Sequence, residues 1–222
     1  MSIDGVSIEP FGESALLVRL GERVDPLLSA RIQSLAAEVN RARESGDGRL
    51  GVAVAGYASL LVPFDPTIGD VSGVAAWLRN AIASNSAEAA VEDWPLIEIP
   101  VRYGGADGPD LDDVARRLGL TSHKVVEVHG SVTYRVYMLG FSPGFGYLGE
   151  LPAALELPRR DTPRARVPAG SVAIAGRQTA VYPLPSPGGW HLIGRTDERL
   201  WDVSREPPAR LSPGQTVRFV SA

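Results

Sequence analysis

Short strand-like segments fill the chain beyond about residue 132, and this pattern constrains the fold more than any other feature of the sequence. The segments are 133–139, 171–175, 179–182, 190–194, 200–203 and 216–220. Glycine and proline stand between almost all of them, as expected where short strands are joined by tight turns. Strands this short and this closely spaced predict a β-barrel or a β-sandwich.

The first 95 residues are organised differently, because strand-like and helix-like segments alternate there. Strands are expected at 14–20, 50–54, 59–64 and 94–101. One helical pattern has the apolar face Leu28, Ile32, Leu35 and Val39, and a second, capped by Asp70, has the face Val71, Val74, Ala75, Leu78 and Ile82. This order predicts a small α+β unit whose helices lie on one face of its sheet.

A domain boundary is expected shortly before residue 100. Residues 83–93 are rich in Ala, Ser, Asn and Glu, which predicts the end of the second helix followed by a linker. We therefore predict an α+β N-terminal domain over residues 1–95 and a mainly β C-terminal domain over residues 96–222.

Residues 110–130 predict two short helices that resemble a helix-turn-helix. Asp110 is expected to cap the first helix, Gly119 to take the left-handed position after it, and Thr121 or Ser122 to begin the second. A DNA-reading helix needs base-reading and phosphate-binding groups, but the second helix offers only His123, Lys124, Glu127 and His129. The chain also carries a net charge of −4. We expect an amphipathic hairpin packed on the barrel and no nucleic-acid partner.

Several classes of chemistry are excluded by what the sequence lacks. It has no cysteine, so disulfides, thiolate nucleophiles and zinc-thiolate sites are ruled out. Its three histidines have no metal-ligand spacing, and we expect no metal site in this chain. P-loop, GxGxxG and GxSxG motifs are absent as well. The N-terminus does not resemble a signal peptide, and no apolar run is long enough to span a bilayer, so we expect a cytoplasmic protein with no membrane contact.

The stretch GFSPGFGYL at residues 140–148 combines three glycines, three aromatic residues and a proline. It has too many glycines for a buried strand, so a loop is expected. Glycines let a ligand approach the main chain closely, and aromatic rings supply an apolar wall, but a tight barrel corner would also need glycines. From these residues alone, both interpretations stay open.

Polar residues near this stretch favour a binding site for a small anionic substrate that carries an amide or a carboxylate. Arg159, Arg160, Arg164 and Arg166 lie close together, Gln178 and Thr179 follow a tight turn, and Arg195 ends a predicted strand. In the strand 133–139, Arg135 and Tyr137 share one face, which is expected to point to solvent or into a lined cavity.

Four long motifs resemble the allophanate hydrolase subunit 1 family. They read PVRYGG, GPDLDDVA, VHGSVTYRVYMLGFSPGFGYLGELP and TPRARVPAGSVAIAGRQTAVYPLPSPGGWHLIGRT, and they cover residues 99–196. The resemblance implies that the C-terminal barrel is cyclophilin-like. It also implies a partner from the allophanate hydrolase subunit 2 family, which is the C component of the complex described next.

The family includes the B component of a bacterial ATP-dependent 5-oxoprolinase, which converts 5-oxoproline to glutamate together with the C and A components. The resemblance therefore implies that this chain is one member of an enzyme complex and is inactive alone. It also implies that ATP and Mg²⁺ bind in the complex rather than to this chain. Two alternatives stay open within the family: an inhibitor of a sensor histidine kinase, and a carboxyltransferase or allophanate-hydrolase-type protein in urea metabolism.

On this resemblance we assign candidate site residues. Arg164 and Arg195 are expected to hold anionic groups and Gln178 to bond the substrate amide, as the catalytic set. The expected substrate-binding residues are Arg135, Tyr137, Phe141, Pro143, Gly144, Phe145, Tyr147, His129 and Thr179.

Overall fold

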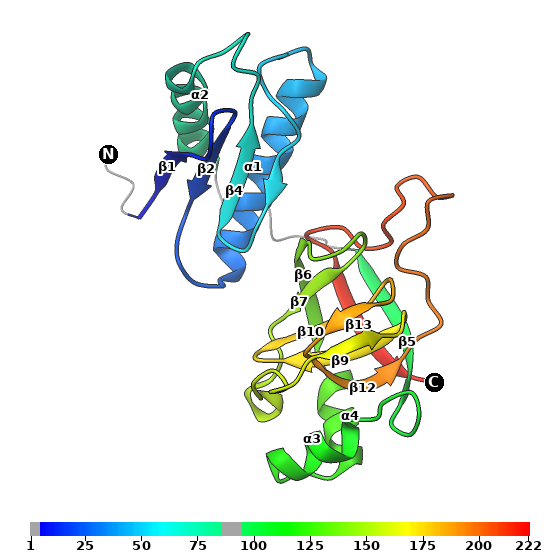
Figure 1. Ribbon diagram of the computed structural model, residues 1–222. Helices are drawn as coiled ribbons and strands as arrows, with labels where there is room; N and C mark the ends of the chain where they lie inside the picture. The colour runs from blue at the N-terminus through cyan, green and yellow to red at the C-terminus, as the bar shows by residue number, and fades with distance from the viewer. Residues whose placement is uncertain (1–4, 86–94) are drawn as a thin grey trace. The chain divides into compact units, whose positions relative to one another are not determined.

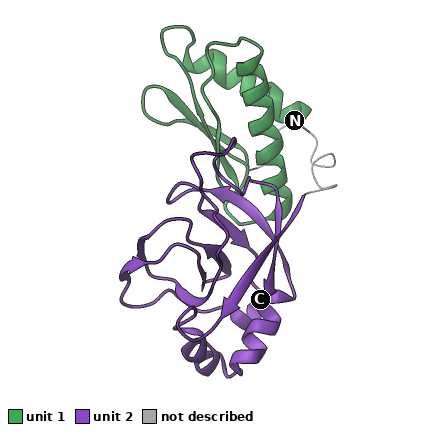
Figure 2. Cartoon of the chain, turned by 90° about the vertical axis from the view of Figure 1, so that its right-hand side faces the viewer, with its two compact units in different colours: residues 1–93 green, residues 94–222 purple. Residues whose placement is uncertain are grey.

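A computed structural model describes residues 5–85 and 95–222 of the chain (Figure 1). The chain forms two compact units, residues 1–93 and 94–222, which Figure 2 colours separately. The predicted linker lies largely outside the described residues, as does Trp94. Each unit is described by itself below.

The first unit is an antiparallel sheet with two helices. The sheet order is β1-β2-β4-β3, with the strands β1 (Ser7–Pro10), β2 (Ala15–Arg19), β3 (Val54–Ala55) and β4 (Ser59–Pro63). The helices are α1 (Pro26–Glu44) and α2 (Val71–Ser84). One core joins the helices to the sheet, and it is built from residues such as Val18, Ile32, Leu35, Leu60 and Leu78.

Local signals explain where these helices begin. The Asp25 carboxylate accepts hydrogen bonds from the N–H groups of Leu27 and Leu28, at 2.8 and 3.0 Å, and Pro26 occupies the first turn. Asp70 accepts from the N–H of Gly73 at 2.6 Å, so its predicted capping role is confirmed.

Three details of this unit differ from the sequence prediction. The strand expected at 50–54 is reduced to Val54–Ala55, because Leu50 forms only an isolated bridge with Phe64. Val71 is 40% exposed, since it begins α2 and lies before the first buried turn. The short strand β1 was not predicted.

The second unit is a closed barrel with the strand order β10-β7-β6-β13-β5-β12-β9. Its strands are β5 (Leu96–Tyr103), β6 (Thr133–Leu139), β7 (Gly146–Gly149), β9 (Ser171–Ala175), β10 (Gln178–Val181), β12 (His191–Arg195) and β13 (Thr216–Ser221). Every pair is antiparallel except β13 with β5, which is parallel. A separate pair, β8 (Arg164–Val167) and β11 (Ser186–Gly188), lies outside the barrel order, and a 3₁₀ turn covers Ala153–Leu155.

Both faces of the barrel wall are buried at strand β9. Val172 and Ile174 belong to the core inside the barrel, while Ala173 and Ala175 belong to a second cluster on the other face. This alternation follows from the two-residue period of a strand. The outward residues are small, and they leave room for aromatic rings above them.

A helical hairpin packs on the barrel as predicted. Helix α3 (Leu111–Leu118) contacts β12, and α4 (Ser122–Gly130) contacts β13. Gly119 has a φ of 66°, and Thr121 accepts a hydrogen bond from the N–H of Lys124, so both boundary predictions are confirmed. Asp110 occupies the N-cap position as predicted, but its side chain makes no capping bond and binds other partners instead.

The barrel strands also correct parts of the sequence prediction. The segment 200–203 is not a strand, because Trp201 forms only an isolated bridge with Ala209. Strands β7, β8 and β11 were not predicted. The buried strand Gly146–Gly149 overlaps the stretch that was expected to be a loop. It needs glycine because a Cβ at Gly149 would lie 2.9 Å from the Tyr137 ring.

Candidate functional site

A small cavity lies over the outward face of the barrel, beside the glycine-rich stretch. Its volume is about 150 Å³, and its lining consists of Phe141, Phe145, Tyr147, Arg159, Tyr182, Gly188, Gly189 and Trp190. The lining comes from the β6–β7 connection with the start of β7, from residues 159 and 182, and from residues 188–190 before β12. Four segments that are distant in sequence therefore meet here.

Edge-to-face aromatic packing fixes the walls of this cavity. The ring of Phe145 lies 5.0 Å from that of Tyr147, 5.4 Å from that of Tyr182 and 5.9 Å from that of Trp190, between ring centroids. All three are T-shaped contacts, the arrangement that aromatic quadrupoles favour. Phe145 is 2% exposed, so it anchors the other rings.

The backbone around the cavity takes conformations that few residues tolerate. Phe141 has a φ of 69°, in the left-handed region that is unfavourable for a bulky side chain. Gly144 also has a positive φ, and a Cβ there would lie 2.9 Å from the Leu200 carbonyl oxygen. A Cβ at Gly188 would overlap the Tyr182 hydroxyl, so the main chain approaches that ring closely.

Arg159 is the charged member of the cavity lining among the described residues. Burial raises the pKa of the Tyr182 hydroxyl, and the Trp190 N–H and the positive charge of Arg159 act in the opposite direction. The tyrosine is therefore a neutral hydrogen-bonding group at neutral pH. The cavity combines an apolar aromatic wall, one phenol and one guanidinium group.

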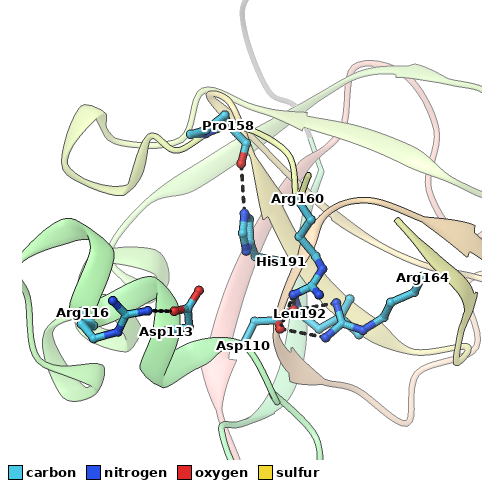
Figure 3. A network of polar contacts seen from close by, with 8 residues as sticks. All are labelled: Asp110, Asp113, Arg116, Pro158, Arg160, Arg164, His191 and Leu192. Carbon is cyan, nitrogen blue, oxygen red and sulfur yellow. Dashed lines mark hydrogen bonds and ion pairs between the residues drawn. The ribbon is translucent and has the colours of Figure 1, made fainter. Parts of the chain in front are cut away.

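The buried carboxylate of Asp110 binds Arg160 and Arg164 (Figure 3). Asp110 accepts two hydrogen bonds from Arg164, at 2.8 and 2.7 Å, and one from Arg160 at 2.9 Å. The N–H of Leu192 donates a fourth, at 2.7 Å. Burial favours the neutral carboxyl, but the Arg164 and Leu192 hydrogen bonds and the charges of both arginines hold the pKa of Asp110 below its ordinary value.

His191 ties the same segment from strand β12. Its Nε2 lies 2.9 Å from the Pro158 carbonyl oxygen, and because a carbonyl only accepts, Nε2 carries the proton. His191 is 1% exposed, and burial lowers its pKa, so the ring is neutral at neutral pH. A shallow polar hollow of about 210 Å³ adjoins it, lined by Asp113, Arg117, Arg160, Asp161, Thr162 and His191.

A separate series of side-chain hydrogen bonds crosses the interior of the barrel. The Thr179 hydroxyl donates to the Ala173 carbonyl, so it accepts from Nε2 of His129 at 2.9 Å. Nδ1 of His129 then accepts from the Tyr103 hydroxyl at 2.8 Å. Burial lowers the pKa of His129 to about 3, so the imidazole is neutral at neutral pH. It links Thr179 to Tyr103 by hydrogen bonds. Neither His129 nor Thr179 lines the aromatic cavity.

The structure separates the predicted site residues into groups. Phe141, Phe145 and Tyr147 line the cavity, whereas Pro143 and Gly144 belong to the same connection without lining it. Arg164 is paired with Asp110. The other predicted residues lie on barrel strands or α4 away from the cavity lining: Arg135, Tyr137, Gln178, Thr179, Arg195 and His129.

The face predicted for Tyr137 differs from the structure. A bulge between Val136 and Met138 interrupts the alternation of β6. Tyr137 is 1% exposed and Arg135 is half-buried, so of the two predicted orientations for this face the one toward solvent is excluded for Tyr137.

Sequence reasoning missed Arg159, Tyr182 and Trp190 as members of this cavity. Arg159 stood in the arginine-rich run, but nothing in the spacing distinguished it from Arg160 or Arg164. Within residues 5–85 and 95–222 no cluster of three or more His, Cys, Asp or Glu side chains is placed to hold a metal ion. None of the described helices is both long and apolar enough to cross a membrane.

Comparison with known proteins gives consistent matches. The family described as carboxyltransferase domain, subdomain C and D, matches residues 6–211. Proteins named as the B component of 5-oxoprolinase are similar in sequence: the Bacillus subtilis protein is 37% identical over 96% of this chain and 91% of its own, and the Haemophilus influenzae protein 38% over 97% of each. The Escherichia coli O157:H7 protein of the same name is 58% identical over 60% of this chain, and the match spans only 61% of that relative's length.

Solved structures show the same fold. The protein TTHA0988 is 42% identical, with a TM-score of 0.82 over 94% of this chain, which spans 40% of the length of that longer chain. A conserved uncharacterized protein from Pyrococcus horikoshii is 40% identical, with a TM-score of 0.57 over 97% of each chain. The Kluyveromyces lactis urea carboxylase is 20% identical, with a TM-score of 0.74 over the whole of this chain and 22% of its own, which shows the fold alone.

Proposed function

The chain belongs to the carboxyltransferase domain, subdomain C and D, family, and from that premise we propose that it acts as the B component of a 5-oxoprolinase. The observation that carries this is the shared name of three relatives, which are 37% to 58% identical to the chain. In this proposal an assembled complex opens 5-oxoproline to glutamate with ATP hydrolysis, and the chain alone is inactive. Its partners are the C component, from the allophanate hydrolase subunit 2 family, and the A component, and its location is the cytoplasm.

The fold assignments of the family form part of the same proposal. We assign an α+β domain to residues 1–95 and a cyclophilin-like barrel to residues 96–222. The closed order of seven strands supports the second assignment. A barrel of this type does not by itself carry an activity, so the function rests on the relatives and on the cavity.

We propose that the substrate binds in the aromatic cavity, whose rings form one wall of the substrate site. Pockets for drug-sized ligands occupy roughly 300–1,000 Å³, whereas this cavity occupies about 150 Å³. It therefore suits one small ring and does not fit a nucleoside triphosphate with Mg²⁺. We accordingly place ATP and Mg²⁺ elsewhere in the assembled complex.

The residues assigned from the sequence enter this proposal in two ways. Arg195 and Gln178 stay proposed contacts to anionic and amide groups in the complex. Arg135 and Gln178 both pair with Gly149 of strand β7, whereas Arg195 pairs with the other end of β9. The anion that Arg164 holds in the structure is the Asp110 carboxylate. We therefore propose that Arg164 supports the site through the segment that it anchors.

Two other functions differ in their support. The relative named urea carboxylase shares the fold at 20% identity, so a carboxyltransferase role is less favoured than the 5-oxoprolinase role. Inhibition of a sensor histidine kinase is a separate possibility within the family. Stoichiometric inhibition of kinase autophosphorylation by the purified chain would support it.

Co-expression with candidate C and A components tests the main proposal. The expected result is a stable complex that forms glutamate from 5-oxoproline only when ATP is present. Omitting this chain should abolish the activity. A well-assembled complex with no ATP-dependent glutamate formation would exclude the proposed function.

A further inference from the structure

We propose that Arg159 binds the carboxylate of the substrate, and that Pro158 and Arg160 are tied on either side of it so that its guanidinium group faces the aromatic cavity. The inference rests on the proposed function, in which the substrate is 5-oxoproline, a five-membered lactam that bears one carboxylate. It assigns the ring to the aromatic wall and the charge to Arg159.

The chemistry of the lining matches such a ligand. Phe145, Tyr147, Tyr182 and Trp190 supply aromatic surface, and Gly188 and Gly189 add main-chain surface that carries no side chain. The volume of the cavity, about 150 Å³, suits a small ring. An arginine forms charge-assisted hydrogen bonds with a carboxylate, and Arg159 is an exposed residue that lines the cavity, where a ligand can reach it.

The charge of Arg159 is available for a ligand, unlike the charges of its neighbours. Arg160 and Arg164 both pair with Asp110, at 2.9 and 2.7 Å. Arg159 forms no ion pair within the part of the chain that the structure describes. Its positive charge is nevertheless felt inside the cavity, where it acts on the pKa of Tyr182.

The backbone on both sides of Arg159 is tied to the barrel. The Pro158 carbonyl accepts from His191 at 2.9 Å, and the Arg160 N–H donates to the Gly189 carbonyl at 2.8 Å. With residues 158 and 160 held, Arg159 lines the aromatic cavity, whereas Arg160 reaches the polar hollow and Asp110.

The hydrogen bonds of Asp110 to Arg160, Arg164 and Leu192, called the Asp110 clasp below, hold the backbone beside the cavity in place. The Asp110 clasp joins the start of α3, the segment at 160–164 and strand β12 through four hydrogen bonds. Figure 3 shows the two guanidinium groups converging on this carboxylate, with His191 reaching Pro158 on the other side. A site held by such contacts loses less conformational freedom when it binds.

The test compares Arg159→Gln with Arg199→Gln in the assembled complex. Arg199 is exposed and outside the cavity lining. Losing a charged hydrogen-bond pair is expected to raise the KM for 5-oxoproline by about 10- to 100-fold in the Arg159 variant. The Arg199 variant should keep the wild-type KM. Calorimetry with 2-pyrrolidinone, which lacks the carboxylate, should show equal and weak binding to wild type and to Arg159→Gln.

Two results would overturn the inference, one in an active complex and one where the proposed function itself has failed. The first is an Arg159→Gln complex with an unchanged KM in an active preparation. The second arises if the wild-type complex forms no glutamate, which removes the proposed function. Calorimetry of the full chain with 5-oxoproline then decides: binding weakened by Arg159→Gln supports the site, and absent or unchanged binding rejects it.

His191 is tested as a positioning residue. His191→Leu removes the hydrogen bond to Pro158, and it is expected to raise KM several-fold while kcat stays near its wild-type value. His191→Gln can still donate to the carbonyl, so it should restore most of the wild-type KM. Equal KM values in both variants, with folded protein confirmed by circular dichroism, would contradict the positioning role.

Discussion

Asp110 balances the charge of two guanidinium groups at a position that is 5% exposed. Removing one partner of such a buried cluster is costly, because the remaining charges stay poorly solvated. Arg160 and Arg164 are 30% and 25% exposed at their side chains, which allows water to offset part of that cost. The clasp is therefore important for stability as well as for the proposed site.

We expect Asp110→Asn to lower the free energy of unfolding by about 2–3 kcal/mol at pH 7. The folded-state pKa of Asp110 is lowered, so its stabilisation is fully present above the unfolded pKa of 3.8 and is lost as the pH falls through the folded value. The difference between wild type and variant should thus be constant between about pH 5 and 7 and shrink below about pH 4. Urea unfolding over a pH series measures it.

Asp197→Asn is the matched control, because Asp197 pairs with Arg102 at a side chain that is 80% exposed. Such a solvent-exposed pair contributes little to stability. A loss as small as this for Asp110→Asn, or a difference that grows on acidification, would contradict the stabilising role.

The partners of Asp110 show what sequence reasoning reaches at the level of residues. Its place at the start of a helix was predictable from local pattern. Its partners were not, because Arg160 and Arg164 follow 50 and 54 residues later. Three arginines that lie close together in the sequence differ in their contacts, because Arg160 and Arg164 pair with Asp110 whereas Arg159 lines the cavity, and only the tertiary structure separates them.

Among the elements, the β6–β7 connection places strain at the edge of the cavity. Phe141 is 60% exposed and has a φ of 69°, yet its ring contacts Phe145 at a centroid distance of 5.2 Å. A left-handed conformation costs a non-glycine residue roughly 1–2 kcal/mol. The ring contacts at the cavity offset this cost in the native protein.

We expect Phe141→Gly to be more stable than Phe141→Ala by about 1 kcal/mol, the reverse of the usual order. Both variants lose the ring, but only glycine relieves the strain. Urea unfolding measures the pair, and Val203, which is 83% exposed, provides the control position. Ala should be at least as stable as Gly at Val203. The same order at Phe141 would refute the strain.

Strand β7 shows why element prediction failed in this region. Its glycines predicted a loop, because glycine disfavours strands. The decisive factor is space, since a Cβ at Gly146 would lie 2.9 Å from Leu211, and one at Gly149 equally close to Tyr137. Both contacts come from tertiary packing, which local propensity does not contain. In contrast, β6 and β9 were predicted with their observed ends, because alternation and turn residues defined them.

At the scale of the whole molecule, the cores are separate. The core of the first unit contains residues between 6 and 82, whereas both clusters of the barrel lie between residues 97 and 219. The many short strands predicted the barrel or sandwich class. They did not predict the closure, because β13 lies between β5 and β6, which precede it by far in the sequence.

We expect a chain of residues 94–222 to fold alone, since its core is complete within those limits. Circular dichroism and cooperative urea unfolding would show this. The same chain ending at residue 213 lacks β13 and should not unfold cooperatively, because β5 and β6 then have no common neighbour. Cooperative unfolding of the shorter chain would reject the closure argument.

The position of β13 also sets the moment at which the barrel can close during synthesis. About 77 residues separate the end of β6 at 139 from the start of β13 at 216, which corresponds to roughly 4–15 s of translation at about 5–20 residues per second. Until residue 221 has left the ribosome, β5 and β6 are synthesised but lack the strand between them. During that interval the edges of β5 and β6 that later pair with β13 stay unpaired. Chaperones that shield such strand edges would act at this stage.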